Sequence, residues 1–288
     1  MTPVPYDNRQ YWCGLHAEGA GRLAAVGYAA FEEGFNRVCY RLRRAAALRL
    51  LARHPEIARF RLLEAAVGVG AYASLWQQLG VRRWVGVDIA DEAVAHCRTH
   101  YPNGEFHTLD LTCDRWPAET SPASGFDLVT AIDVLYHLVD DGMFEAAIGN
   151  LAPRVCAGGG LLLSDVFVRQ DRQIAPHVKR RSLATYRRAL GPDFVLAGRE
   201  SVFSILADPV PRSRLHVSDQ AMLAAWRVLA RIVLHAPPAA RCAVGAAVAT
   251  LARPLDALLR EAGLARGVNL ELALFKRRNA ARPSVSRA

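Results

Sequence analysis

The feature that most limits how this chain can fold is an alternation of patterns between residues 60 and 167. Short apolar runs bounded by Gly, Asp or Pro alternate with stretches whose apolar spacing is typical of helices. The runs read FRLLEAAV, WVGVDI, EFHTLDL, FDLVTAI and GGLLLSDVF, and the stretches between them read ASLWQQLG, DEAVAHCRTH and DGMFEAAIGNLAPRV. Such alternation indicates βαβ units, and therefore an α/β domain whose parallel sheet is covered by helices on both faces.

The segments on either side of this region carry different patterns. Residues 10–55 are predicted to be helical, including 22–28 and 35–51, and Ser182 is a plausible N-cap of a helix over 183–190. Residues 210–265 are predicted to be helical with breaks at Pro237, Pro238 and Pro254, and VNLELALFK is expected to form a final strand. The expected division is 1–58, an N-terminal helical lid; 59–209, the core; 210–265, a helical cap insertion; 266–276, the last core strand; and 277–288, a disordered basic tail.

Composition narrows the class of protein. The 288 residues are 52% apolar and 22% charged, as in globular proteins, and the net charge is +9 because arginine dominates the basic residues. That charge fits either a solvated surface or an acidic partner. The six cysteines form no C-x-x-C pair, so neither a zinc site nor a disulfide framework is indicated, and a reducing cytoplasm is favoured. Without a signal core or an 18-residue apolar run, we expect no membrane-spanning helix.

A glycine-containing turn follows the first expected strand, in LLEAAVGVGAY. Gly68 and Gly70 would let the backbone approach a ligand closely just before a helix begins. Asp88 ends the second expected strand 20 residues after Gly68, where a carboxylate can accept two ribose hydroxyls. The letters GVGAYA also match the dinucleotide fingerprint G-x-G-x-x-A, so an NAD-binding domain is one interpretation.

Four further features point away from NAD. Glu64 lies four residues before Gly68, where NAD domains need no acid, and Asp110 ends the third expected strand. The fourth strand runs into AIDVLYHL, with Asp133 and His137, and the chain ends with a long strand after a helical insertion.

With these features in this order, the chain resembles the class I S-adenosylmethionine-dependent methyltransferases over residues 60–167 and 268–276. The resemblance implies a Rossmann-like, doubly wound, mostly parallel seven-stranded sheet with an antiparallel last strand, and S-adenosyl-L-methionine as the cofactor. LLEAAVGVG looks like the first motif of the family. It departs from that motif at Ala66, where glycine is usual, and we expect a tight but usable loop.

The resemblance also implies roles for individual residues. Glu64, Ala66, Gly68 and Gly70 would shape the site for the methionine half, Asp88 would hold the ribose and Ile89 would pack on adenine. Asp110 and the backbone of Leu111 would contact the adenine amino group, and the carbonyl near Ile132 would hold the ammonium. Tyr11, with Trp12, would fold over the cofactor or pack in the core.

Chemistry could reside beyond the fourth strand. His137 is the candidate general base, because its ordinary pKa suits proton transfer near neutrality, although a packing role is open. Tyr136 would line the acceptor pocket. Asp165 would face the pocket or cap the next segment, and the run Lys179–Arg181 would attract an anionic substrate or face solvent. His96 and His100 lack a third ligand, so no metal site is expected.

The sequence says least about the molecule that accepts the methyl group. Nucleic-acid amino methyltransferases carry a proline-rich motif where this chain has IDVLYH, so we expect a small, hydrophobic or aromatic metabolite, as in natural product biosynthesis. Whether C, N or O is methylated stays open.

Residues 210–265 could cover the acceptor, form a dimer face, or contact a membrane surface through Arg227 and Arg231. The protein is expected to be a monomer or a homodimer. The alternative functions are an NAD-dependent oxidoreductase and a non-catalytic cofactor-binding partner protein.

Overall fold

A seven-stranded sheet forms the centre of the molecule. The structure is a computed structural model that describes residues 6–19, 21–57, 61–213 and 215–279. The strands lie in the order β3-β2-β1-β4-β5-β9-β8, and β9 runs antiparallel between β5 and β8 while β1 to β5 are parallel. This confirms the predicted fold class. The bounds are β1 (Arg61–Ala65), β2 (Arg83–Asp88), β3 (Glu105–Thr108), β4 (Phe126–Ala131), β5 (Val155–Asp165), β8 (Phe194–Ser201) and β9 (Glu271–Arg277).

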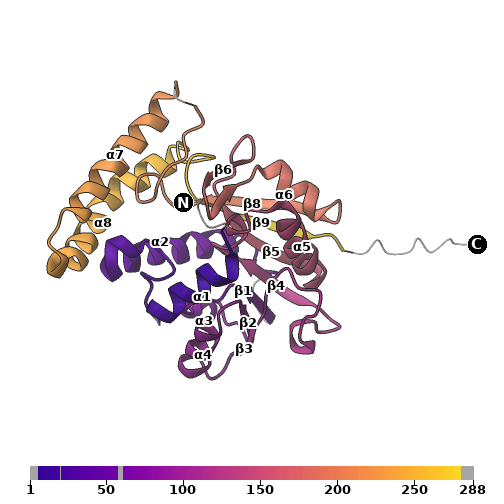
Figure 1. The fold of residues 1–288 in the computed structure, drawn as a ribbon. Coiled ribbons are helices and arrows are strands. Elements are labelled where there is room, and N and C mark those ends of the chain that lie inside the picture. Colours follow the sequence, from indigo (N-terminus) through magenta and orange to yellow (C-terminus); the bar gives the residue numbers. More distant parts are fainter. Residues whose placement is uncertain (1–5, 20, 58–60, 214, 280–288) are drawn as a thin grey trace, which may run out of the picture.

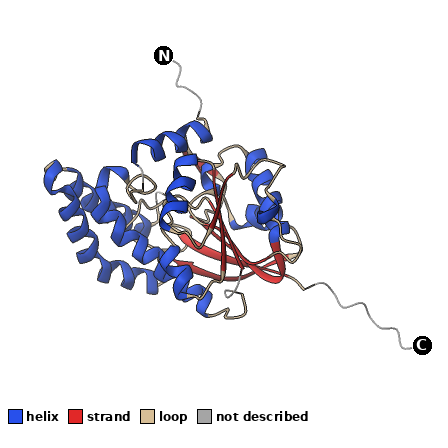
Figure 2. Cartoon of the chain, turned by 90° about the horizontal axis from the view of Figure 1, so that it is seen from below, coloured by secondary structure: helices blue, strands red, loops and turns tan. Residues whose placement is uncertain are grey.

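Each face of the sheet has its own hydrophobic core, because side chains alternate along a strand. In β1, Leu62 packs into one core and Leu63 into the other. The core containing Leu63 also contains residues of the helices on its face, such as Phe144 and Tyr186, and Figure 2 shows helices on either side of the sheet. The helices that follow the strands are α3 (Ala73–Gln78), α4 (Asp91–His100), α5 (Asp141–Leu151) and α6 (Leu183–Leu190), with short 3-10 helices η2 (Ala118–Thr120), η3 (Leu135–His137) and η4 (Ala152–Arg154). The Ser182 side chain accepts from Thr185 N–H and so caps α6, as predicted.

The N-terminal segment is less continuous than its apolar spacing predicts. It contains α1 (Asn8–Gly19), η1 (Ala29–Phe31) and α2 (Glu32–Ala52). The expected helix over 22–28 is a series of turns instead. The Asn36 side chain accepts from Tyr28 N–H and donates to Tyr28 C=O, and these bonds hold Tyr28 outside any helix.

A second, two-stranded sheet was not predicted. Strands β6 (Arg172–Ala175) and β7 (Val178–Arg180) form an antiparallel hairpin whose turn contains His177. The hairpin lies between β5 and α6 in the chain, and β7 packs near η3. It therefore places His177 beside His137 in η3.

Two long helices form a hairpin that projects on the side of the molecule away from α5 and α6 (Figure 1). They are α7 (Val217–Leu234) and α8 (Pro238–Glu261), and the break predicted at Pro254 does not occur. A proline inside a helix removes one backbone hydrogen bond. Tertiary contacts hold α8 beyond it, because the Asp256 carboxylate accepts from the backbone N–H groups of residues 204, 205 and 206.

Helix α8 also crosses α2 at very short range. A Cβ on Gly34 would lie 2.0 Å from the Cys242 carbonyl oxygen, so only glycine permits this approach. Contrary to our expectation, α8 is long and apolar enough to span a membrane by length and composition, with 17% of its most apolar window buried. Of the predicted tail, Arg277 completes β9, and residues 280–288 lie outside the described part of the chain.

Candidate cofactor and acceptor site

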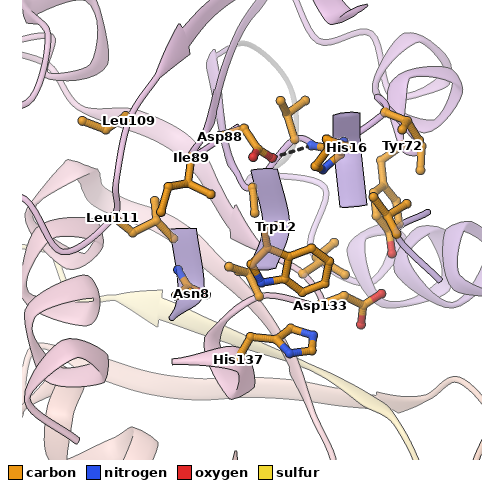
Figure 3. A pocket seen from close by; sticks show the side chains of 18 of the residues that line it. Asn8, Trp12, His16, Tyr72, Asp88, Ile89, Leu109, Leu111, Asp133 and His137 are labelled. Atoms are coloured by element: carbon orange, nitrogen blue, oxygen red, sulfur yellow. Dashed lines mark hydrogen bonds between the residues drawn. The ribbon is translucent and has the colours of Figure 1, made fainter. Parts of the chain in front are cut away.

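A pocket of about 810 Å³, including its mouth, opens at the carboxyl ends of β1, β2 and β4. This is the edge at which open α/β sheets bind ligands, and the volume suits a drug-sized molecule. Helix α1 crosses over it, and Figure 3 shows Trp12 of that helix between Asp88 and His137. The lining residues are Asn8, Trp12, His16, Val26, Tyr40, Ala66, Val67, Gly68, Val69, Ala71, Tyr72, Asp88, Ile89, Leu109, Asp110, Leu111, Ile132, Asp133, Val134, His137 and Leu138.

The turn after β1 forms one wall of this pocket. Gly68 has φ +54° and faces α1: a Cβ there would lie 3.6 Å from Val26 and 4.0 Å from His16. Gly70 does not line the pocket. Its φ is +69°, and a Cβ would collide with the Tyr101 ring at 2.2 Å, so this glycine serves packing. Ala66 adopts φ +56°, which is strained for a residue with a Cβ and explains why glycine suits this position better.

Asp88 is held in place by the backbone around it. Its Oδ2 accepts from Gly68 N–H at 2.8 Å and its Oδ1 from Ala90 N–H at 3.0 Å. Each carboxylate oxygen keeps a lone pair for a further donor. Burial raises the pKa of Asp88, and the charge of His16 opposes that shift. His16 points toward this carboxylate from α1 (Figure 3).

Beside Asp88 the pocket is apolar. Ile89, Leu109 and Leu111 line it together with Asp110 (Figure 3 labels the first three). The Asp110 Oδ1 accepts from the backbone and hydroxyl of Thr112, which leaves Oδ2 free of partners among the described residues. Apolar side chains together with the Asp88 and Asp110 carboxylates suit a nucleoside, and the same pocket extends along Gly68 and Val69, where the methionine part of S-adenosylmethionine would lie. The residues present therefore fit this cofactor.

Glu64 lies behind the pocket rather than in it. The residue is 3% exposed, its carboxyl accepts from Trp76 Nε1 at 2.7 Å, and it does not line the pocket. Burial raises the pKa of Glu64 to about 8, partly offset by the Trp76 hydrogen bond. In this structure the side chain is therefore predominantly protonated at neutral pH and supports the strand end from below.

The end of β4 carries a polar cluster centred on Asp133, which the sequence marked at the end of the fourth strand but to which we assigned no contact. Its Oδ2 accepts from Arg43 Nε at 2.7 Å, and its Oδ1 accepts from the hydroxyls of Ser164 and Tyr136. Tyr136 is not a lining residue: its hydroxyl donates to Asp133 and the Arg180 guanidinium covers its ring. The sequence predicts that Tyr136 lines the acceptor pocket, but these contacts turn it inward.

Tyr72 contributes an unpaired polar group to the pocket. The residue is 5% exposed, and its buried hydroxyl has no hydrogen-bond partner among the described residues. Leaving a buried hydroxyl unpaired is costly, so a ligand atom is the natural partner. Tyr72 directly follows the glycine turn, but nothing in the sequence indicated that its hydroxyl would be buried and unpaired beside the pocket.

His137 lies in η3 and lines the pocket. Its Nδ1 lies 2.8 Å from the His177 carbonyl oxygen, and its ring meets Trp12 edge-on at 4.7 Å between centroids. Because a carbonyl only accepts, Nδ1 carries the proton and Nε2 is the free nitrogen. Burial lowers the pKa of His137 to about 3. The imidazole is neutral near pH 7 and is a weak base.

Aromatic contacts hold helix α1 over the pocket. Tyr11 is 36% exposed and does not line the pocket. Its ring stacks on His177 at 5.1 Å between centroids, while the neighbouring Trp12 enters the pocket.

The sequence analysis did not identify two other pocket residues of α1, Asn8 and His16. Helical spacing from Trp12 would have suggested both, since they lie four residues before and after it on one face.

Buried charged residues that do not line the pocket support the segment that carries His137. Arg181 is fully buried and donates to the Leu138 carbonyl and to Asp141. Asp165 is also fully buried and accepts from the Tyr186 hydroxyl and two backbone N–H groups, so it caps the next segment. The basic run Lys179–Arg181 pairs with Asp141 and Asp165 instead of facing solvent freely.

Two further groups of residues lie outside the pocket. Among the described residues of 210–265, none lines the pocket, and Trp226 packs instead against Tyr28, Phe31 and Phe35. His96 and His100 stack on each other at 4.0 Å, and no cluster of three metal-binding side chains occurs within the described ranges.

Part of the chain and its fold are similar to those of known proteins. Residues 62–160 match the methyltransferase domain family. No curated protein sequence matches the chain. The S-adenosylmethionine-dependent methyltransferase of Leishmania major is 11% identical, with TM-score 0.53 over 68% of this chain and 74% of that one. The N-methyltransferase NodS of Bradyrhizobium japonicum with S-adenosyl-L-homocysteine is 15% identical, with TM-score 0.46 over 82% and 86%.

The magnesium protoporphyrin IX methyltransferase of Synechocystis, with its bound cofactor, is 18% identical, with TM-score 0.49 over 70% of this chain and 93% of that one. At these identities the Leishmania protein supports the fold alone. The family match covers β1 to β4 and the first half of β5, and so includes the ends of β1, β2 and β4 that build the pocket. Residues 62–160 therefore carry a methyltransferase domain, in a Rossmann-like fold whose pocket residues fit S-adenosylmethionine.

Proposed function

We propose that the protein catalyses methyl transfer from S-adenosylmethionine to a small, hydrophobic or aromatic metabolite in the cytoplasm. One observation carries the proposal: the nucleoside-sized slot at Asp88 and the Trp12–Asp133–His137 region belong to a single pocket. A bound cofactor and a small acceptor would then share one enclosed space. The bound cofactor supplies an electrophilic methyl group on a sulfonium.

The protein's own contribution is positioning. Trp12, Val134 and Leu138 offer an apolar surface to an acceptor, and the α1 lid excludes water around it. Holding a nucleophile in line with a methyl group can supply much of the rate by proximity alone. This arrangement favours an acceptor with apolar or aromatic character.

The state of His137 favours an acceptor that attacks without prior loss of a proton. A general base works best with a pKa near the working pH, and burial lowers the pKa of His137 to about 3. An electron-rich carbon or a neutral amine needs no such base, because its proton leaves after attack. We therefore favour C- or N-methylation, with His137 Nε2 as a hydrogen-bond acceptor for the substrate.

The unpaired hydroxyl of Tyr72 supplies a second contact. It lies in the same pocket as Asp133, whose carboxylate is bound to Arg43. We propose that Tyr72 hydrogen-bonds a polar atom of the acceptor. The Tyr72→Phe variant should raise the acceptor KM while leaving affinity for S-adenosylhomocysteine unchanged. An equal loss of S-adenosylhomocysteine affinity would place that hydroxyl on the cofactor instead.

The test of the function uses the full chain with isotope-labelled S-adenosylmethionine and a panel of aromatic and aliphatic amines, phenols and carbon nucleophiles. Mass spectrometry should detect a methylated product and S-adenosylhomocysteine in equal amounts. Calorimetric binding of S-adenosylhomocysteine without transfer to any acceptor would favour the non-catalytic partner protein. Binding of NAD in its place would favour the oxidoreductase.

A further inference from the structure

Asp133 has a backbone conformation that its surroundings must hold in place. Its φ is +59°, in the left-handed region where a residue with a Cβ is strained. It lies between the end of β4 and the start of η3, and it lines the pocket together with Ile132 before it and Val134 after it. Strained residues of this kind persist only where several contacts fix them, and they are concentrated at ligand sites. The contacts of Asp133 therefore bear on the shape of the pocket.

Side chains from β5, α2 and η3 fix this turn. From β5, the Ser164 hydroxyl accepts from Asp133 N–H at 2.6 Å and donates to Asp133 Oδ1 at 3.0 Å, so that it binds the backbone and the side chain of the strained residue at once. From α2, Arg43 Nε donates to Oδ2 at 2.7 Å. From η3, the Tyr136 hydroxyl donates to Oδ1 at 3.2 Å. Because His137 follows Tyr136 in η3, these bonds also orient the segment that carries the imidazole.

The two strongest partners of Asp133 stand outside the pocket. Neither Arg43 nor Ser164 is among the described residues that line it. The Arg43 guanidinium lies 4.9 Å from the ring centroids of both Tyr40 and Phe203, which hold it on its other sides. A buried ion pair contributes little net stability, because the cost of removing both charges from water offsets their attraction. Stability by itself therefore does not account for the pair between Arg43 and Asp133.

We infer that Asp133, fixed by Ser164 and Arg43, is a positioning residue that sets the turn from Ile132 to His137 in the geometry that receives the ligands of the pocket. The inference rests on the proposed function for the identity of those ligands, S-adenosylmethionine and a small acceptor. It adds to that function the contacts that preform the pocket wall. A turn that is already ordered increases affinity, because it does not lose conformational freedom when a ligand binds.

The test compares two buried hydroxyls on neighbouring strands of the full chain. Ser164→Ala removes the bonds to Asp133. The matched control, Thr130→Val on β4, removes a hydroxyl that is as fully buried and has no hydrogen-bond partner among the described residues. In calorimetry, Ser164→Ala should bind S-adenosylhomocysteine roughly tenfold more weakly than wild type, the equivalent of about one hydrogen bond. Thr130→Val should bind it as wild type does.

A second pair of variants tests the ion pair. Arg43→Met removes the donor to Asp133 and should weaken S-adenosylhomocysteine binding by roughly tenfold as well. Arg43→Lys keeps a charged donor and should recover part of that loss. Each affinity is measured well below the unfolding transition of the variant, so that a loss of stability alone does not change it. If Ser164→Ala and Arg43→Met lower the melting temperature but keep the wild-type affinity, the contacts serve stability alone and the inference is overturned.

A measurement on the protein without ligand separates this inference from the proposed function. In NMR spectra of the histidine side chains, the ring signals of His137 should shift in Ser164→Ala and stay unchanged in Thr130→Val. Binding of S-adenosylhomocysteine without transfer to any acceptor would contradict the proposed function and leave both comparisons intact. Unchanged His137 signals in Ser164→Ala would show that the turn keeps its geometry without this hydroxyl and would overturn the inference.

Discussion

The Nδ1 atom of His137 lies 2.8 Å from the carbonyl oxygen of His177, so the imidazole donates to the turn of the β6–β7 hairpin. This bond selects the tautomer with a free Nε2 and ties the pocket wall to the hairpin. It contributes to orienting the ring, while burial lowers the pKa of His137 to about 3. The residue that the sequence indicates as a base is a neutral, oriented group.

Substitution of His137 tests this role directly. His137→Ala should lower kcat by roughly tenfold or less, since only positioning is lost, rather than the 10²–10⁴ typical of a general base. His137→Asn keeps a donor for the His177 carbonyl and should recover part of that loss. The wild-type kcat should show no inflection from this group between about pH 5 and 8, as measured by steady-state kinetics. A thousandfold loss in a folded, cofactor-binding Ala variant would restore the base role and point to a hydroxyl acceptor.

Asp88 should determine cofactor affinity. Asp88→Ala removes the carboxylate expected to accept the ribose hydroxyls and should weaken S-adenosylhomocysteine binding by about 1.5–3 kcal/mol in calorimetry. Glu92→Gln, on the exposed side of α4, is the control and should bind normally. NAD should bind neither form appreciably. Unchanged affinity in Asp88→Ala would remove this residue from the cofactor site.

Glu64 should make stability depend on pH. Its pKa is about 8 in the folded protein and 4.5 in the ordinary state, so the unfolded chain loses its proton first as pH rises. Stability should therefore be greatest below about pH 4.5 with respect to this group and should fall as the pH rises to about 8, by on the order of 5 kcal/mol. Glu64→Gln keeps an acceptor for Trp76 and abolishes this dependence.

Denaturant unfolding at several pH values measures that difference. Subtracting the Glu64→Gln curve from the wild-type curve isolates Glu64 from the other buried acids. Parallel curves would show that Glu64 is ionised in the folded protein. Wild type should also be less stable than the glutamine variant at pH 8.

Trp226 should contribute to stability and not to substrate selection. It is 7% exposed and packs against Phe31 at 5.4 Å and Tyr28 at 5.3 Å between ring centroids. Trp226→Ala should cost about 3–5 kcal/mol of unfolding free energy, as for other buried tryptophans. Cofactor affinity and acceptor KM, measured below the unfolding transition, should change little. A selective change in KM would return α7 to the role of acceptor cap.

The local sequence patterns determined the strands of the parallel sheet and the helices between them. Short apolar runs predict strands wherever they occur, and parallel strands bring their carboxyl ends to one edge. For that reason the sequence pattern itself predicts Gly68 and Asp88 beside a ligand site, and the family resemblance adds Asp110 and Ile132; all four line the pocket. The antiparallel last strand was predictable in a different way, through resemblance to a family.

The tertiary structure decided the ionisation states of the residues at the site and their hydrogen-bond partners. Burial and contacts between distant segments set them, and neither is encoded in the spacing of neighbouring residues. His137 differs from a solvated histidine because the His177 hairpin and Trp12 enclose it. Glu64 lies behind the pocket because Trp76 Nε1 donates a hydrogen bond to its carboxyl group. Pro254 lies within a continuous helix because contacts to residues 204–206, made through Asp256, outweigh the local preference for a break.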